Sequence, residues 1–522
     1  MAFPGRALAL FVCLPLVGCV FGPGRTGPEG LSGYDTDLRS IARQEDFERA
    51  LELTDEGNGD DAGDDLLREL HRAALLHYDG QYESSNELLQ EAEREIEDRH
   101  TKSVSRAALS VLTNDRVLAY NPPSFERIML HYYGALNYLA LGELDEAAVE
   151  ARRMSARLVR DEEAEEDARH DRFRRTMHYV AGTVFEAAGE WNAAEVAYRN
   201  AWEGWDLTPG RPESELGTGP GVAPGPARDS SLSRGLAALT PSLIARDGSP
   251  PPDSGEVVLL LETGFVAHRI ERALAVPIFE GDVNGLNTGE DDSRYNQGLC
   301  IAARAMGARA SIDPSDCSNP GGKSLFVVTV AWPEMRRSGE SVRAARLRAY
   351  PRSTDEPVDS RLVASGAPPG SLVLPDSPVG WADPEDSLTV PTRLTIDLSS
   401  VATSEFDARI GGIVAKAIVR ATTKYLVVKA VKEEVKEEDE TLGTIFGFLG
   451  NAAAVATERA DTRSWHLLPG AIRVARLSLP TGVHDIAVEL EPYRNAKPVR
   501  IDLGEVRIRP GSVRILSLRS WP

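Results

Sequence analysis

The stretch from Leu112 to Met154 alternates apolar and polar residues with the period of a helix, in two halves separated by Gly142. Apolar residues of the first half fall on one helical face: Ile128, Tyr132, Ala135, Leu136 and Leu139. Small residues dominate the matching face of the second half, so two helices can pack closely: Leu144, Ala147, Ala148 and Ala151. Glycine tolerates the left-handed backbone that ends a helix. The stretch therefore predicts a helical hairpin. We expect Pro122-Pro123 to lie just before its first helix and Ser124 to cap the start of that helix.

Two further segments follow the same frame around Gly80 and Gly189. This pattern about a turn glycine is typical of a tetratricopeptide (TPR) repeat. The turn glycines lie 62 residues apart (80 to 142) and then 47 apart (142 to 189), whereas a regular array spaces them by about 34. We therefore expect a degenerate TPR-like helical repeat domain over residues 64–205. Unrelated helical hairpins that share turn chemistry are the alternative.

Beyond residue 254 the pattern changes to β-branched runs bounded by turn residues, which predict strands. The first four runs are 255–264, 324–332, 342–350 and 388–398, and the last four are 472–479, 483–491, 499–508 and 512–518. The last four predict a small antiparallel sheet or sandwich edge, with a hairpin turn at the LPTG segment that joins the first two of them. Between the two sets, a long helix is predicted from Glu405 to about Glu438, followed by a glycine-rich segment, 441–455, read as a buried helical hairpin. Insertion of that segment at a membrane interface is its alternative.

The expected fold class is α+β, with an N-terminal TPR-like α-helical array followed by a mixed β-rich C-terminal domain, 255–522. Proline and glycine dominate residues 206–254, which indicates a linker. Residues 19–63 are interpreted as a lipid anchor and flexible tether. Within them, residues 21–33 are rich in glycine and proline, and residues 34–62 are expected to begin as a helix and to end in an acidic loop.

Residues 1–18 have the features of a lipoprotein signal peptide. Arg6 precedes an apolar run that is too short to span a membrane, and Leu16-Val17-Gly18-Cys19 resembles a bacterial lipobox. Lipidation is therefore predicted at Cys19, which places the chain on a membrane through a diacylglyceryl or acyl anchor. An ordinary cleaved signal peptide is the alternative. Val20 stands where an aspartate would favour inner-membrane retention, so the outer membrane is favoured, with the body in the periplasm.

Chemistry-bearing residues are sparse. Cys300 and Cys317 remain as a pair in an oxidising compartment, which predicts a disulfide, and no histidine lies near either of them. The net charge of −22 argues against nucleic acid. The sequence has no Gly-x-Ser-x-Gly elbow, P-loop or His-Glu-x-x-His motif. We therefore expect no catalytic residue, metal or cofactor.

Polar residues in two segments are given structural roles. In the segment 461–470, Asp461 and Arg463 are expected to form a buried pair beneath Trp465 that locks the glycine-rich hairpin to the final sheet; a recognition site is the alternative. Tyr120 is assigned to a structural loop. Asn137 is expected to face Glu150 and Arg153 of the following helix.

The concave face of the predicted array is the candidate binding surface. Tyr132 and Tyr179 each lie ten residues before a turn glycine, and His77 and Glu186 lie three residues before one. We expect these four side chains to face a bound peptide, with the tyrosines as anchors. In the alternative, the tyrosines pack against residues 161–175 or against the C-terminal domain.

Three blocks of sequence resemble a family of bacterial TPR-like envelope lipoproteins of unknown function. They are LTND with ALNYLALGELDEAAVEARRM, GEVVLLLETGFVAHRI, and ERADTRSWHLLPGAIRVARLSLPTG. The chain departs from the family where Phe265-Val266-Ala267-His268 replaces a proline-lysine pair. The resemblance implies an anchor and a scaffold, and it transfers no catalytic residues.

These observations favour a non-enzymatic, lipid-anchored scaffold that binds an unidentified envelope protein or peptide. The alternative is an envelope hydrolase acting on cell-wall material. Such an enzyme requires a carboxylate pair or a nucleophile–base pair in a cleft of the β domain. A structural spacer in an export assembly is a third hypothesis.

Overall fold

The computed structural model describes residues 30–56, 64–103, 119–162, 168–202, 253–279, 282, 291–306, 317, 324–339, 342–351, 387–438, 459–493 and 497–521. Several predicted features lie outside these residues. They are the signal segment 1–18, Cys19, the linker as far as residue 252, the LTND block and the glycine-rich segment 441–455.

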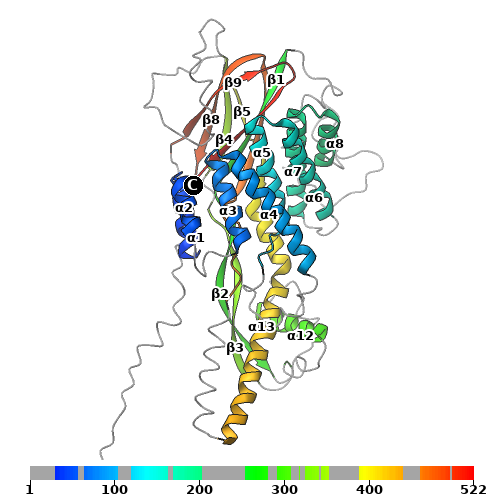
Figure 1. The fold of residues 1–522 in the computed structure, drawn as a ribbon, viewed down its shortest axis with the longest axis vertical. Coiled ribbons are helices and arrows are strands. Elements are labelled where there is room, and N and C mark those ends of the chain that lie inside the picture. The colour runs from blue at the N-terminus through cyan, green and yellow to red at the C-terminus, as the bar shows by residue number, and fades with distance from the viewer. Residues whose placement is uncertain are drawn as a thin grey trace, which may run out of the picture.

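The predicted hairpins are formed by helices α3 to α8, joined in pairs by the three turn glycines (Figure 1). Their bounds are α3 Asp65–Tyr78, α4 Tyr82–Ser103, α5 Ser124–Leu141, α6 Leu144–Glu162, α7 Ala168–Ala187 and α8 Trp191–Trp202. Gly80, Gly142 and Gly189 have φ of 78°, 79° and 77°. In every turn the glycine N–H donates to the carbonyl three residues back, and the next N–H donates to the carbonyl five back, at 2.8–3.2 Å. The three turns thus share one glycine-dependent helix ending.

Two helices precede the hairpins, α1 (Gly33–Arg43) and α2 (Phe47–Glu56). Leu38 and Phe47 are buried in the same core as the hairpins. Arg39 of α1 is 1% exposed and donates to the carbonyls of Val266 and His466, at 3.2 and 2.8 Å. The helix expected to begin near residue 34 is confirmed by α1. The inclusion of residues 33–56 in a flexible tether is wrong, because buried apolar and polar contacts fix both helices to the body.

A four-stranded sheet packs against the hairpins, with strand order β10-β1-β7-β6. Its strands are β1 Ser254–Thr263, β6 Leu394–Asp397, β7 Ala471–Pro480 and β10 Val513–Ser520. β10 runs parallel to β1, and β7 runs antiparallel to it. β1 is buried on both faces: Val258 and Leu260 lie in the core shared with the helices, while Val257 and Leu259 face a second sheet.

The second sheet has the order β5-β4-β8-β9. Its strands are β4 Val342–Pro351, β5 Leu388–Pro391, β8 Gly482–Pro492 and β9 Val499–Ile508. β7 and β8 belong to different sheets, so the LPTG segment is a corner between layers, and the predicted hairpin turn there is wrong. The last four strands do not form a sheet of their own, because β7 and β10 flank β1 instead.

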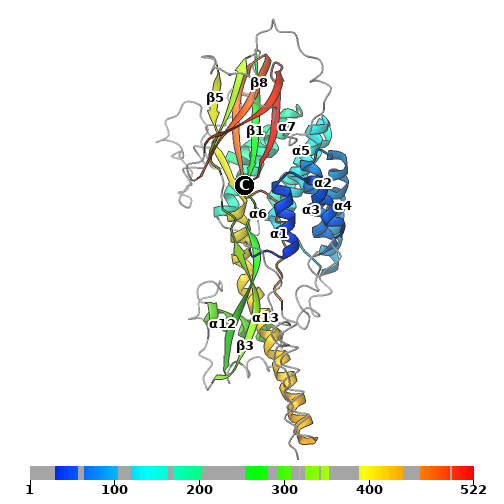
Figure 2. The same cartoon turned by 90° about the vertical axis from the view of Figure 1, so that its left-hand side faces the viewer.

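The head of the molecule thus has three layers: helices, the β10-β1-β7-β6 sheet, and the β5-β4-β8-β9 sheet (Figure 2). One continuous apolar core contains residues of the hairpins together with Trp465, Ile472 and Val513 from the C-terminal part. The helical and β-rich parts expected as separate domains therefore share a core.

An arm extends from the head (Figures 1 and 2). It consists of the two-stranded antiparallel ribbon of β2 (His268–Phe279) and β3 (Ser324–Arg336), with helices α12 (Asp291–Met306) and α13 (Leu398–Glu438) beside it. The arm has its own core, which includes Val276, Val330 and Ile410. α13 has 41 residues, so its length is about 60 Å. β2 and α12 were not predicted from the sequence.

Candidate functional site

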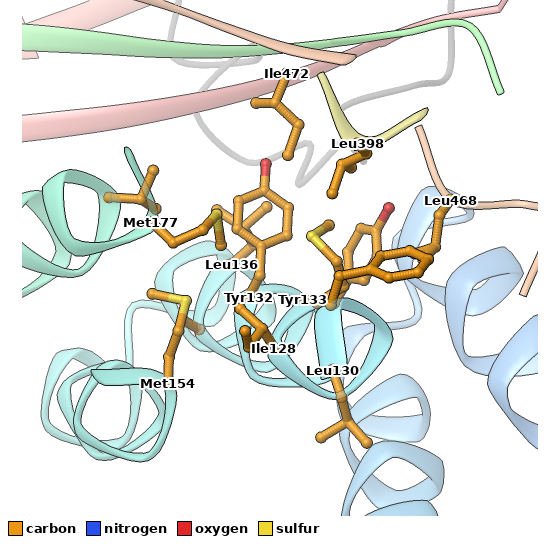
Figure 3. Close-up of a cluster of buried hydrophobic side chains, with 14 of the residues drawn as sticks. Ile128, Leu130, Tyr132, Tyr133, Leu136, Met154, Met177, Leu398, Leu468 and Ile472 are labelled. Atoms are coloured by element: carbon orange, nitrogen blue, oxygen red, sulfur yellow. The ribbon is translucent and has the colours of Figure 1, made fainter. Parts of the chain in front are cut away.

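The four side chains predicted to line a concave binding face are buried, so that prediction is wrong. Tyr132 is 1% exposed and Tyr179 is 0% exposed, and His77 and Glu186 are buried as well. In Figure 3 the hydroxyl of Tyr132 points toward Ile472 of β7. The face is filled because the β10-β1-β7-β6 sheet places its apolar residues against it. The alternative, packing of the tyrosines against the C-terminal part, is the arrangement found.

Glu186 is part of a buried ionic cluster between α7 and the sheet. Arg476 of β7 donates from Nη2 to Glu186 Oε2 at 2.8 Å and also to Glu256 of β1. Its Nη1 donates to the Tyr198 hydroxyl at 3.1 Å, and that hydroxyl donates to Glu186 at 2.6 Å. All four side chains are buried. The carboxylate predicted to face a ligand therefore neutralises a buried arginine.

His77 is part of a polar network between the first two hairpins. Its Nδ1 donates to Asn137 Oδ1 at 2.5 Å, and Asn137 Nδ2 donates to Ser85 and Asn86 of α4 at 2.9 and 2.8 Å. The expected contact of Asn137 with Glu150 and Arg153 is therefore wrong. Asn137 fixes the pairing of α5 with the preceding hairpin rather than with α6.

The segment 459–470 contains the predicted Asp–Arg pair. Arg463 donates to both carboxylate oxygens of Asp461, at 2.8 and 3.0 Å, and Trp465 is fully buried. The segment is fixed to the helical array, because Arg463 also lies 3.7 Å from Asp64 and the Trp465 N–H donates to Glu126 at 3.1 Å. The predicted lock onto a glycine-rich hairpin involves residues outside the described part of the chain.

Glu126, in the first turn of α5, is a buried carboxylate that the sequence did not single out as a site. Its Oε2 accepts a short hydrogen bond from the hydroxyl of Tyr120, and its Oε1 accepts the bond from Trp465. Burial raises the pKa of Glu126 from 4.5 to about 7. Near neutral pH this group therefore exists in both its protonated and its ionised forms. Tyr120 has the structural role expected of it.

Glu405, near the start of α13, is a second buried carboxylate beside Glu126. Its Oε1 accepts from the backbone N–H of Ser124 at 3.0 Å and from Arg409 at 2.9 Å. Pro123 occupies the N-cap of α5 without any side-chain capping bond, so the predicted Ser124 cap is wrong. Glu405 Oε2 is buried and has no hydrogen-bond partner among the described residues.

These two carboxylates line a pocket at the junction of α5, β2 and α13. Arg269 of β2 lies 5.6 Å above the Phe406 ring, and it makes no ion pair within 4 Å with any acidic side chain in the described ranges. Two carboxylates in different environments, with an arginine beside them, have the components of acid–base chemistry. The pocket volume is only ≈ 40 Å³, about three water molecules. A sugar ring does not fit without movement of the lining elements.

A third titratable cluster joins α1, α3 and the segment 459–470. His466 Nε2 lies 2.9 Å from Asp35 Oδ1, and the ring centroids of His71 and His466 are 4.3 Å apart. Burial opposes ionisation of Asp35, but the charge and hydrogen bond of His466 outweigh it and lower the pKa of Asp35 to about 2. Burial, with the charge of His466, lowers the pKa of His71 well below 6.5. The cluster therefore stabilises the position of α1.

The predicted cysteine pair is present in the structure. Cys300 of α12 and Cys317 form a disulfide with a Cα–Cα separation of 5.4 Å, which is within the normal range. Among the residues with described positions, no group of three His, Cys, Asp or Glu side chains is placed to hold a metal ion.

Comparison of the chain with family models, with curated proteins and with solved structures finds no match. Within the described ranges, no helix combines the length and the apolar character needed to cross a lipid bilayer.

Proposed function

We propose that this chain is a non-enzymatic, lipid-anchored scaffold of a bacterial cell envelope. In this proposal Cys19 carries the lipid, the outer membrane holds the anchor, and the body lies in the periplasm. The hairpins α3–α4, α5–α6 and α7–α8 are a degenerate TPR-like array. Their shared glycine turns, with nearly equal φ and the same hydrogen bonds, support this assignment.

The arm is the observation that carries the proposal. The arm has a small apolar core of its own, formed by β2, β3, α12 and α13. It is therefore a separately packed part of the fold and not an extension of the head core. The arm is long, with a helix of about 60 Å beside a two-stranded ribbon, and its core is small for that length. Much of its surface is therefore open to contact with other molecules. Because Tyr132 and Tyr179 are buried, we assign the partner surface to the outside of the head or to the arm.

The anchor is tested by fractionation of the wild type and Cys19→Ala. A single acyl chain binds membranes only marginally, and more than one holds stably. The wild type should incorporate labelled fatty acid and fractionate with membranes, and Cys19→Ala should move to the soluble fraction. The lipid anchor is rejected if the wild type incorporates no labelled fatty acid and Cys19→Ala still fractionates with membranes.

The scaffold role is tested by chemical cross-linking in the native envelope, followed by purification of the lipidated chain. The proposal predicts a discrete covalent adduct with another envelope protein. It fails if the chain is recovered only as the monomer at every cross-linker length.

A second candidate function is supported by the pocket between Glu126 and Glu405. The pKa of about 7 at Glu126 suits a general acid, and this observation favours the envelope hydrolase. The test is release of soluble fragments from cell-wall material by the wild type and by Glu126→Gln. An enzyme should lose about a hundredfold or more of its rate in the variant. No release by the wild type rejects the hydrolase.

A further inference from the structure

A larger pocket lies where the turns of the second and third hairpins meet the start of β10. Its volume is ≈ 300 Å³, at the lower end of the range of ligand sites. Arg507, Arg509 and Arg514 line it, and all three are exposed. None of them makes an ion pair within 4 Å with an acidic side chain of the described residues. In a chain of net charge −22, three exposed arginines around one pocket favour an anionic ligand.

The pocket runs along the edge of strand β10. Three consecutive residues of the strand, Val513, Arg514 and Ile515, all line it. Successive side chains of a strand point to opposite faces, so a pocket lined by all three must lie beside the strand and not above either face. β10 is the edge strand of its sheet. The backbone groups on its outer side therefore border the pocket.

The hydrogen bonds to β1 identify which backbone groups point outward. The Glu256 N–H donates to the Ser512 carbonyl at 2.8 Å, and Glu256 is paired with Val513 in parallel register. In a parallel pair, bonds to the neighbouring strand alternate along each chain. Arg514 therefore bonds toward β1, whereas the N–H and C=O of Val513 and Ile515 point into the pocket.

The opposite wall of the pocket is apolar. Leu139 and Leu144 flank the Gly142 turn, and Ala187 ends α7. A Cβ at Gly142 would meet nothing within 4 Å, so the space beside this turn is open. A ligand that fills the pocket must combine negative charge, backbone hydrogen-bonding groups and apolar side chains.

We propose that this pocket binds an extended acidic peptide segment of a partner protein, which adds as a strand beside β10. Carboxylates of the segment pair with the three arginines, its backbone pairs with Val513 and Ile515, and an apolar side chain packs on Leu139 and Leu144. The inference rests on the proposed scaffold function and names the surface and the class of partner.

The test uses the full-length chain in detergent and a short fluorescein-labelled peptide of alternating Glu and Val, with fluorescence anisotropy as the readout. The wild type should bind this peptide, and higher salt should weaken the binding because salt screens exposed charges. The variant Arg507→Gln/Arg509→Gln/Arg514→Gln should bind at least about tenfold more weakly. A peptide N-methylated on alternate residues should lose binding, because it cannot complete the strand pairing.

The matched control is Arg199→Gln/Arg272→Gln/Arg343→Gln, which removes the same charge from three arginines that are more than half exposed elsewhere. This control should bind as the wild type does. The proposal is overturned if the variant Arg507→Gln/Arg509→Gln/Arg514→Gln binds the peptide as tightly as the wild type does. It is also overturned if the wild type binds a peptide with Lys in place of Glu equally well. Arginine-dependent binding of vesicles containing anionic phospholipid, without peptide binding, overturns it as well. If cross-linking in the native envelope still recovers a partner when the three pocket arginines are replaced, the scaffold function is retained and this surface is rejected.

Discussion

The carboxylate of Glu405 accepts a hydrogen bond from the backbone N–H of Ser124 at 3.0 Å, across 281 residues of sequence. The bond caps the first turn of α5 with a side chain from the first turns of α13. Glu126, in the same first turn of α5, accepts a hydrogen bond from the backbone N–H of Trp465. The helical array, the arm helix and the segment 459–470 therefore meet at one buried polar junction.

Replacement of Glu405 should test this long-range cap. Glu405→Ala leaves the Ser124 N–H without its acceptor, and loss of an N-terminal cap typically costs about 1–2 kcal/mol. Glu405→Gln keeps an oxygen acceptor and should lose less. The free energy of unfolding in urea measures both. Equal values for the alanine and glutamine variants would show that the bond contributes no stability.

Glu126 should make the stability depend on pH. Burial raises its folded-state pKa to about 7, whereas the unfolded chain has the ordinary value of 4.5. Below pH 4.5 the carboxyl is protonated in both states; between pH 4.5 and 7 the unfolded state loses its proton first. This contribution to the free energy of unfolding therefore falls as pH rises, by on the order of 3 kcal/mol.

Glu126→Gln is the control for that titration, since the amide is neutral at every pH and nearly the same shape. The difference in unfolding free energy between wild type and variant should change across pH 4.5–7 and level off above it. A difference that stays constant over this range contradicts the assignment.

Arg476 should be indispensable to the packing of α7 on the sheet. Arg476→Met leaves the buried Glu186 and Glu256 carboxylates together without a counter-charge, which typically costs about 3–5 kcal/mol. The triple variant Arg476→Met/Glu186→Gln/Glu256→Gln removes all three charges and should regain most of that loss. Denaturant midpoints of the two variants measure the effect. No recovery in the triple variant would mean that shape, and not charge, decides this contact.

The disulfide should stabilise the arm and leave the head unchanged. Cys300 and Cys317 are 17 residues apart, and closing such a loop contributes about 3 kcal/mol in the chain-entropy model. Cys300→Ser/Cys317→Ser should accelerate amide hydrogen exchange in α12, β2 and β3. Exchange in α5 and α7 is the internal control. If hydrogen exchange in α5 and α7 accelerates as much as in the arm, the arm does not have a separate core.

Local features of the fold were predictable from the sequence, because they depend on nearby residues. Gly80, Gly142 and Gly189 end helices through their own backbone freedom, and the β-branched runs after residue 254 form strands. β2 was also within reach, since Ile270, Leu274, Val276 and Ile278 alternate along it. Its charged residues and Pro277 concealed the pattern.

The tertiary arrangement was not predictable, because no local pattern specifies which strands pair. The LPTG segment has the composition of a hairpin turn. The two strands that it joins nevertheless pair with other strands, β7 with β1 and β8 with β4. Glu126 and Glu405 lie far apart in the sequence, and a glutamate near the start of a helix is ordinary. Only the packing of α13 beside α5 turns these two residues into a pocket.

The double variant Tyr132→Ala/Tyr179→Ala tests whether these two tyrosines belong to the core that the hairpins share with the β10-β1-β7-β6 sheet. Both rings are buried, and removing a large buried ring costs about 3–5 kcal/mol. Urea unfolding followed by tryptophan fluorescence should therefore show a large fall in the free energy of unfolding. Wild-type stability together with loss of partner capture would contradict this core assignment, because it would show that the two rings face a bound partner.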